Sequence, residues 1–207
     1  MIYIFFETNF FLRLALKQEK YQLAFKLLRL AEQKKIKLVF PSFCISEAYG
    51  ALFKKIEVQR KIKNNLDQFI EQTKRSGHMK SSIKSYTESS QNIAKKTGKE
   101  LTFLDVNIKR VLKIAESIEH TAIVQQNGVK FRSSLDIKNE PDAFIISAVD
   151  YYVKTKLPPN SQAFFITSDE KSLGNKPEVK NLMRRRKIKL YTSLNICIGE
   201  LKRNGII

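Results

Sequence analysis

Short, almost wholly apolar segments alternate along the chain with longer segments in which apolar residues recur every three or four positions. Residues 2–6 and 163–166 are apolar runs with a composition typical of strands buried on both faces, and residues 36–40 and 188–191 are predicted as two further strands. Residues 21–31 carry apolar side chains at helical spacing and are predicted to form an amphipathic helix. Strands that alternate with helices predict an α/β fold, a three-layer α/β/α sandwich with a central parallel sheet.

The same spacing predicts further helices along the rest of the chain. They cover residues 10–17, a segment from 45 that runs on until Ser76-Gly77 breaks it, 83–96 before an interruption at Gly98, 104–126, 140–149, 178–186 and 194–201. Asn127-Gly128 to Asn139 is expected to be a loop. The middle of the chain, approximately residues 56–135, is polar and its apolar stripes are too narrow to form a core alone. We interpret it as a helical insertion or cap within a single domain of residues 1–207.

The charge balance of the chain indicates what kind of partner it binds. The chain has 38 Lys and Arg against 20 Asp and Glu, a formal net charge of +18 and a pI near 9.9. Such a balance favours a polyanionic partner, of which nucleic acid is the leading candidate. A lysine-rich surface without a binding role is the alternative. The run Arg184-Arg185-Arg186-Lys187 is the first candidate for contact with RNA.

The two cysteines, Cys44 and Cys197, lie in apolar surroundings and lack metal-site spacing. We interpret them as buried thiols of a protein in a reducing compartment, and zinc is not expected. No apolar run approaches the roughly 18 residues of a membrane span, so no membrane is expected and a cytoplasmic location is predicted.

Four carboxylates stand where strands or helices should hold them near one sheet edge. Glu7 follows the first strand, Asp169 follows the strand at 163–166, Asp142 opens an apolar helix and Glu47 belongs to the first turns of another. Clustered carboxylates repel one another, so a cation normally stabilises them. Oxygen ligands without His or Cys favour Mg²⁺ or Mn²⁺. A divalent ion beside a basic surface suits phosphodiester hydrolysis.

Each of these acids also has a purely structural interpretation. Glu7 can serve as the anion at a helix start, Asp142 can cap its helix, and Glu47 can be a solvated helix residue. Five other titratable residues are interpreted as surface or supporting groups without a catalytic role: Asp136, Glu140, Asp150, His78 and His120.

The order of short motifs resembles one protein family. Phe6-Glu7-Thr8-Asn9 follows the first strand, Pro41 to Glu47 starts a helix, Pro141-Asp142-Ala143 precedes an apolar helix, and Thr167-Ser168-Asp169 follows a late strand. This order resembles the PIN-domain nucleases, which are metal-dependent ribonucleases of toxin–antitoxin pairs, RNA processing and RNA decay. The resemblance covers residues 1–55 and 136–200, and the middle section is longer than in the compact toxin members.

The resemblance implies roles for individual residues. Glu7, Asp142 and Asp169 would be ligands of Mg²⁺ or Mn²⁺, and Glu47 would be a ligand or a water-orienting acid. Asn9, Thr167 and Ser168 would hold the carboxylates or the substrate by hydrogen bonds. The implied function is an endoribonuclease that acts on RNA, with an antitoxin or another regulatory protein as partner and homodimerisation as a further expectation.

One departure from the family supports a second interpretation. The first acid of the family is usually Asp, whereas Glu7 is longer by one methylene, and Mg²⁺ requires nearly ideal octahedral geometry. A catalytically inactive PIN-like module that binds RNA or a protein is therefore the alternative. The fingerprints of P-loop and dinucleotide-binding proteins are missing from the sequence.

Overall fold

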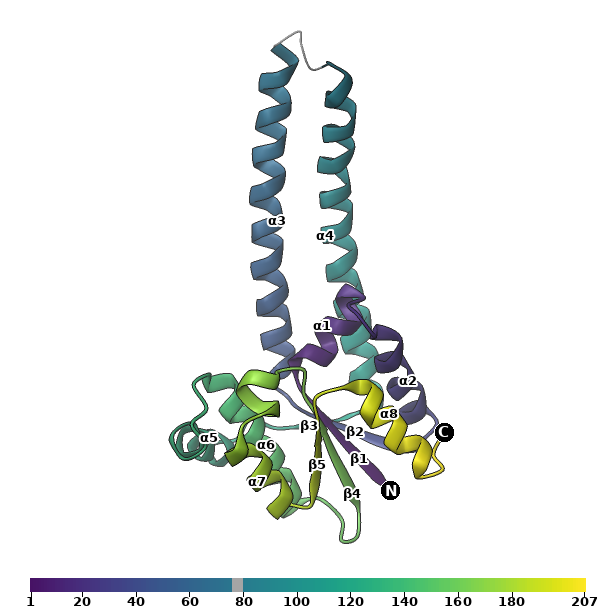
Figure 1. The fold of residues 1–207 in the computed structure, drawn as a ribbon, viewed down its shortest axis with the longest axis vertical. Helices are drawn as coiled ribbons and strands as arrows, with labels where there is room; N and C mark the ends of the chain where they lie inside the picture. Colours follow the sequence, from purple (N-terminus) through teal and green to yellow (C-terminus); the bar gives the residue numbers. More distant parts are fainter. Residues whose placement is uncertain (76–79) are drawn as a thin grey trace.

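The computed structural model of the chain describes residues 1–75 and 80–207, and the breaking residues Ser76 and Gly77, together with His78, lie outside the described residues. Within the described chain, five strands form one all-parallel sheet in the order β3-β2-β1-β4-β5 (Figure 1). The strands are β1 (Ile2–Phe6), β2 (Ile36–Pro41), β3 (Glu116–Ile118), β4 (Gln162–Ile166) and β5 (Ile188–Tyr191). The predicted α/β fold with a central parallel sheet is confirmed.

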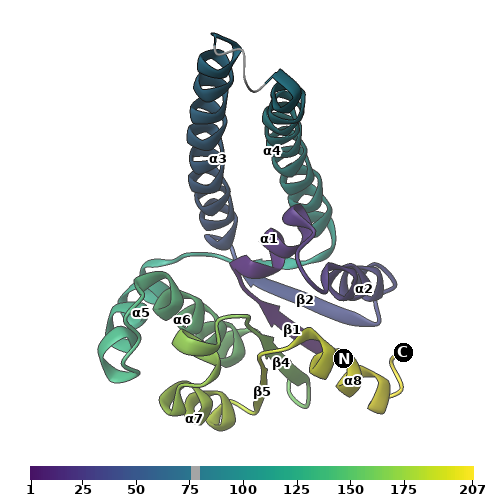
Figure 2. The ribbon, with the colours of Figure 1, turned by 45° about the horizontal axis from the view of Figure 1, so that its top comes forward.

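Helices surround this sheet and connect its strands. They are α1 (Thr8–Leu16), α2 (Tyr21–Glu32), α3 (Cys44–Arg75), α4 (Lys80–Ile114), α5 (Ala122–Ser134), α6 (Glu140–Thr155), the π-helical turn η2 (Glu170–Gly174), α7 (Pro177–Arg185) and α8 (Leu194–Arg203). Helices α5, α6 and α7 lie on one side of the sheet and α2 and α8 on the other, which gives the three layers (Figure 2).

Strand β1 is the centre of the sheet. All five of its residues are buried, and it pairs with β2 on one side and with β4 on the other. Phe6 lies opposite Ile166, so the residues that follow these two strands emerge side by side at the carboxyl edge. The chain order reverses between β1 and β4, and in parallel α/β sheets such a switch point is where ligands bind.

Helices α3 and α4 form a long antiparallel hairpin that projects from the carboxyl edge of the sheet (Figure 1). Polar contacts join the two helices along its length. Lys55 Nζ lies 2.7 Å from Glu100 Oε1, and Ser90 Oγ donates to Asp67 Oδ1 at 2.5 Å. The polar character of the middle section therefore belongs to a helix pair that extends into solvent. Its assignment as an insertion within a single domain stays a prediction.

The interruption expected at Gly98 is wrong. Helix α4 continues through this glycine, and open space surrounds the position where a Cβ would stand. A single glycine costs a helix only about 0.5–1 kcal/mol relative to alanine. Contacts of α4 with α3, α1 and α2 offset that cost.

The helix expected over residues 104–126 and the loop expected after it are also wrong. Helix α4 ends at Ile114, the short strand β3 follows, and α5 then contains Gly128. Strand β3 has only three residues and is held by distant partners: Tyr152 Oη donates to Glu116 Oε2 at 2.9 Å. A Cβ at Gly128 would collide with the Phe144 ring, so this glycine permits close packing of α5 on α6 rather than a turn.

The remaining expected strands and helices are present within a few residues of their predicted bounds. Cys44 and Cys197 are buried free thiols, as predicted, and burial raises the pKa of both. Among the described residues, none of the helices combines the length and the apolar character that crossing a membrane would require.

Candidate active site

Glu7 is buried directly after β1, and several donors hold its carboxylate. Its Oε2 accepts from the Asn9 backbone N–H at 2.7 Å, so Glu7 is the N-cap of α1. Its Oε1 accepts from Asn9 Nδ2 and from the Ser168 N–H, both at 3.1 Å, and lies 3.5 Å from Thr167 Oγ1. Burial raises the pKa of Glu7, although these hydrogen bonds oppose the rise. The predicted helix-start role is thus present, and the carboxylate also joins the ends of β1 and β4.

Asp169 follows β4 and begins the π-helical turn. Its Oδ1 accepts from the Ser172 N–H at 2.7 Å, and its own N–H donates to Thr167 Oγ1 at 3.0 Å. Thr167 is fully buried and therefore links Asp169 to Glu7 through a single hydroxyl group. Hydrogen bonds with the backbone therefore fix the position of Asp169.

Asp142 stands in the first turn of α6, three residues after the N-cap Asn139. The capping interpretation of Asp142 is therefore wrong, because Asn139 occupies the cap position. Asp142 is only 6% exposed, and its Oδ2 is buried without any hydrogen-bond partner. Burial raises its pKa to about 6, with further increases from Asp169 and Glu47 and partial offsets from Asn139 and Ser172.

Glu47 is half-buried in the first turn of α3 and is not the solvated helix residue of the alternative interpretation. Thr8 Oγ1 donates to Glu47 Oε2, which ties α3 to the start of α1. The negative charge of Glu47 raises the pKa of both Glu7 and Asp142. The four predicted acids therefore act on one another electrostatically at one edge of the sheet.

The fit of this edge to a divalent cation can be judged from its donors. The ligand atoms are carboxylate oxygens, which suit Mg²⁺ and Mn²⁺, and Asp142 Oδ2 is a buried acceptor with no partner. Asp142 is electrostatically coupled to Asp169 and Glu47. Within residues 1–75 and 80–207, however, no group of three or more His, Cys, Asp or Glu side chains is arranged so as to hold a metal ion. The chemistry of the donors fits a cation, and the convergence of Glu7, Asp142 and Asp169 on one ion stays a prediction.

Arg13 is a site residue that the sequence analysis missed. Its Nη2 donates to Ser168 Oγ at 3.0 Å, while its Nε is buried without a partner. Burial lowers the pKa of Arg13, and the nearby Glu7 opposes that shift. The signal was available, because Arg13 is the only charged residue within Thr8–Leu16. A lone cation in an apolar helix indicates a specific partner.

The arginines of the basic run lie elsewhere. Helix α7 ends at Arg185 and β5 begins at Ile188, which places them at the amino edge of the sheet, opposite the acidic residues. Arg184 and Arg185 are exposed, whereas Arg186 Nε lies 2.5 Å from Asp150 Oδ1. A role of Arg184 and Arg185 in RNA contact stays a prediction, and Arg186 has an internal partner.

Among the acids interpreted as surface or supporting groups, Asp150 differs from the others in its burial. Asp150 is 2% exposed and also lies 2.7 Å from Lys154 Nζ, so it is a buried structural anion rather than a surface residue. Asp136 and Glu140 are largely exposed, as expected, and pair with Lys176 and Arg132.

His120 is exposed, as expected, although it follows β3 instead of lying in a helix. Its ring lies 5.3 Å from that of Phe43 and 5.2 Å from that of Phe144, both edge-on. These phenylalanines stand four residues before Glu47 and two after Asp142. Phe43 and Phe144 therefore lie on the same segments of the chain as Glu47 and Asp142.

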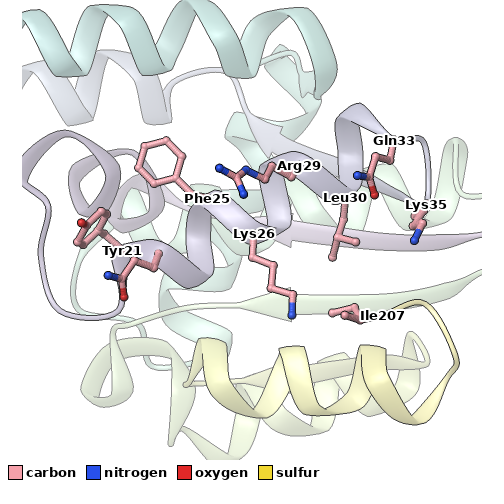
Figure 3. A pocket seen from close by; sticks show the side chains of 9 residues that line it. Tyr21, Phe25, Lys26, Arg29, Leu30, Gln33, Lys35 and Ile207 are labelled. Carbon is pink, nitrogen blue, oxygen red and sulfur yellow. The ribbon is translucent and has the colours of Figure 1, made fainter.

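A hollow of about 640 Å³ lies on α2 and contains none of the four acids (Figure 3). Tyr21, Phe25 and Arg29 line it along α2, and Ile207 closes its far side. It is separate from the site at the carboxyl edge.

Comparison with known proteins gives a single finding. Residues 4–172 match the model of a family described as PIN domain. No curated protein and no solved structure gives a significant match. The matched region includes the sheet centre, the projecting hairpin and all four buried or half-buried acids. The family match covers most of the sequence and agrees with the parallel sheet and its acidic edge, and the chain therefore belongs to the PIN domain family.

Proposed function

We propose that this protein is a metal-dependent endoribonuclease that hydrolyses RNA phosphodiester bonds with Mg²⁺ or Mn²⁺. PIN domains are generally nucleases, and they typically use divalent metal ions. The observation that carries the proposal is Asp142, a buried carboxylate with an unpartnered oxygen and a pKa raised chiefly by burial and further by its acidic neighbours. A group of this kind at a switch point is typical of functional sites.

Asp142 and Asp169 are the residues best suited to hold the ion, with Glu7 completing the acidic edge. A bound divalent ion would neutralise phosphoryl charge and activate water for attack on the phosphodiester. Glu47 would orient that water, because Thr8 fixes one of its carboxylate oxygens and leaves the other available. Arg13, beside Ser168, would place a positive charge near the phosphate.

The test is Mn²⁺-dependent cleavage of a labelled single-stranded RNA by Asp169→Asn. The change removes the charge but keeps an oxygen that can accept from the Ser172 N–H, so the turn should persist. Cleavage should fall by at least about 100-fold, in line with the loss of an electrostatic catalytic group. Asp136→Asn is the matched control, because Asp136 is largely exposed and has a positive φ that asparagine accommodates. Equal cleavage by both variants would contradict the proposal.

The second candidate is an inactive PIN-like module that binds RNA or a protein. The observation in its favour is Glu7, whose two oxygens already accept hydrogen bonds from Asn9 and Ser168. Absence of cleavage by the intact protein with either ion, together with retained RNA binding, would favour this candidate.

A toxin role, inhibition by an antitoxin and homodimerisation are further parts of the proposal that rest on the family alone. A cytoplasmic location is a further part that rests on the sequence. Expression of the intact protein should slow growth if it is a toxin, and Asp142→Asn should restore growth. Normal growth with the intact protein would point to RNA processing instead.

A further inference from the structure

A second hollow, of about 320 Å³, lies where the end of α1 meets the base of the hairpin. Its walls come from two segments that are distant in the sequence, and α1 packs directly on α4 (Figure 2). The lining residues are Ala15, Leu16, Lys17, Asn92, Lys95, Lys96, Lys99, Glu100 and Phe103. We call Lys17, Lys95, Lys96 and Lys99 the lysine cluster.

The α4 part of this wall is one continuous helical face. Lys95, Lys96 and Lys99 follow Asn92 by three, four and seven residues, and Phe103 follows by eleven. Residues at these spacings lie on the same side of a helix. An interruption at Gly98 would separate Lys95 and Lys96 from Lys99, so the cationic face exists because α4 is unbroken.

The lysine cluster is exposed at the surface. In the part of the chain that the structure describes, none of the four forms an ion pair with a carboxylate. Glu100 also lines the hollow; its Oε1 pairs with Lys55 on α3, and its Oε2 is buried without a hydrogen-bond partner. Lys17 Nζ instead lies 4.7 Å from the centre of the Phe103 ring. Like charges at i and i+4, as in Lys95 and Lys99, oppose helix formation, and an anion relieves that repulsion.

Helix α1 connects the lysine cluster to the acidic edge. Glu7 caps the start of this helix, and Lys17 is the residue at its end. Its nine residues span about 13 Å at 1.5 Å per residue. Arg13 lies within α1, four residues before Lys17, and contacts Ser168 at the site. Cations therefore extend from the carboxylates to the base of the hairpin without an intervening acidic residue on α1.

We propose that the lysine cluster binds the phosphate backbone of single-stranded RNA and directs the strand along α1 to the acidic edge. This inference rests on the proposed ribonuclease function. About four nucleotides of a stacked strand, at roughly 3.4 Å each, span the length of α1. Phe103 offers a ring for base contact, as in other proteins that bind single strands through cations and aromatic side chains.

The experiment measures binding of a fluorescein-labelled 12-nucleotide single-stranded RNA by anisotropy, in EDTA and over a series of salt concentrations. The variant is Lys95→Gln/Lys96→Gln/Lys99→Gln, because glutamine keeps the helix propensity of lysine and removes its charge. Each lost phosphate contact should lower the salt slope by about 0.7 and the affinity at 0.1 M salt by about fivefold, so the triple variant should bind about 100-fold more weakly.

The matched control removes three charges at the amino edge of the sheet, by Lys34→Gln/Lys156→Gln/Lys202→Gln. These lysines are exposed, stand at or after the ends of α2, α6 and α8, and do not line the hollow. The control should keep at least about a third of the wild-type affinity. Equal losses in the two triple variants would overturn the inference, since net charge alone would then account for binding. Equally tight binding of a poly-aspartate peptide would also overturn it, in favour of an acidic protein segment.

Cleavage separates this inference from the proposed function. With Mn²⁺, the Lys95→Gln/Lys96→Gln/Lys99→Gln variant should have a higher KM for the 12-nucleotide RNA and a kcat within about twofold of wild type. Wild-type KM in that variant would overturn the inference while the ribonuclease stands. Absence of cleavage by the intact protein would count against the ribonuclease, and the EDTA binding series would still decide the role of the lysine cluster.

Discussion

The two ends of α1 hold their charges in opposite ways. At its start, Glu7 is buried and accepts hydrogen bonds from Asn9 and Ser168, while Asp142 is buried nearby without a full set of partners. At its end, the lysine cluster is exposed to solvent. Burial makes the acidic charges costly and fixes their positions, whereas water screens the lysines. The fixed acidic charges suit chemistry at a single phosphate, whereas the solvent-screened lysines suit binding to many phosphates of an RNA strand.

The largest expected effect comes from Asp142→Asn, which removes the costly buried charge. We expect Mn²⁺-dependent cleavage to fall by at least about 100-fold, because the unpartnered oxygen belongs to the proposed ion site. The free energy of unfolding of the metal-free protein should instead increase in this variant. A pKa of about 6 in the folded protein, above the ordinary value of 3.8, means that the native state holds this proton more tightly than the unfolded state.

The metal-free wild-type protein should therefore lose about 2 kcal/mol of stability as pH rises from 4 to 6, since 1 pKa unit corresponds to about 1.4 kcal/mol. The decline should continue through pH 6 and level off above about pH 7, where Asp142 is ionised in both states. Asp142→Asn should remove the decline and be the more stable protein at pH 7.5. Thermal unfolding in EDTA at several pH values measures both quantities, and an unchanged pH profile would show that Asp142 is not desolvated.

Glu7→Gln tests whether the acidic edge is held by hydrogen bonds or only by charge. The amide retains one acceptor oxygen, but its NH₂ group must face the N–H of Asn9 or of Ser168. We expect a loss of about 1–2 kcal/mol, the cost of leaving a buried donor unsatisfied. Denaturant unfolding at pH 7.5 measures it. A gain in stability would mean that relief of charge repulsion outweighs these bonds.

The smallest expected effect lies in the hairpin. Gly98→Ala should stabilise the protein by about 0.5–1 kcal/mol, because a Cβ meets no atom within 4 Å and alanine favours the helix. RNA binding should be unchanged, since Gly98 does not line the hollow of the lysine cluster. A lower melting temperature would indicate that the chain departs from helical geometry at this glycine, as its sequence suggested.

Local sequence determined the elements that are buried on both faces or have one strong apolar side. Residues 2–6 and 163–166 are apolar runs with a carboxylate soon after them, and burial of such runs in a parallel sheet follows from their composition. The placement of Glu7 and Asp169 beyond the strand ends follows in turn. Short motifs at these ends were sufficient to suggest the family that the comparison with known proteins shows.

Tertiary structure decided what depends on partners distant in sequence. Gly98 remains helical because α4 packs on neighbouring helices, and Gly128 remains helical because Phe144 on α6 approaches its backbone. Strand β3 exists because β2 supplies its hydrogen bonds and Tyr152 and Lys37 bind Glu116.

Partners that are distant in sequence also decide which charged residues are buried and paired and which are exposed. Asp150 is buried against Arg186, whereas Asp136 is exposed. Lys17 joins three lysines that lie about eighty residues further along the chain, because α1 packs on the base of α4. Local propensity acts over a few residues, while burial and electrostatic pairing depend on distances that only the folded chain defines.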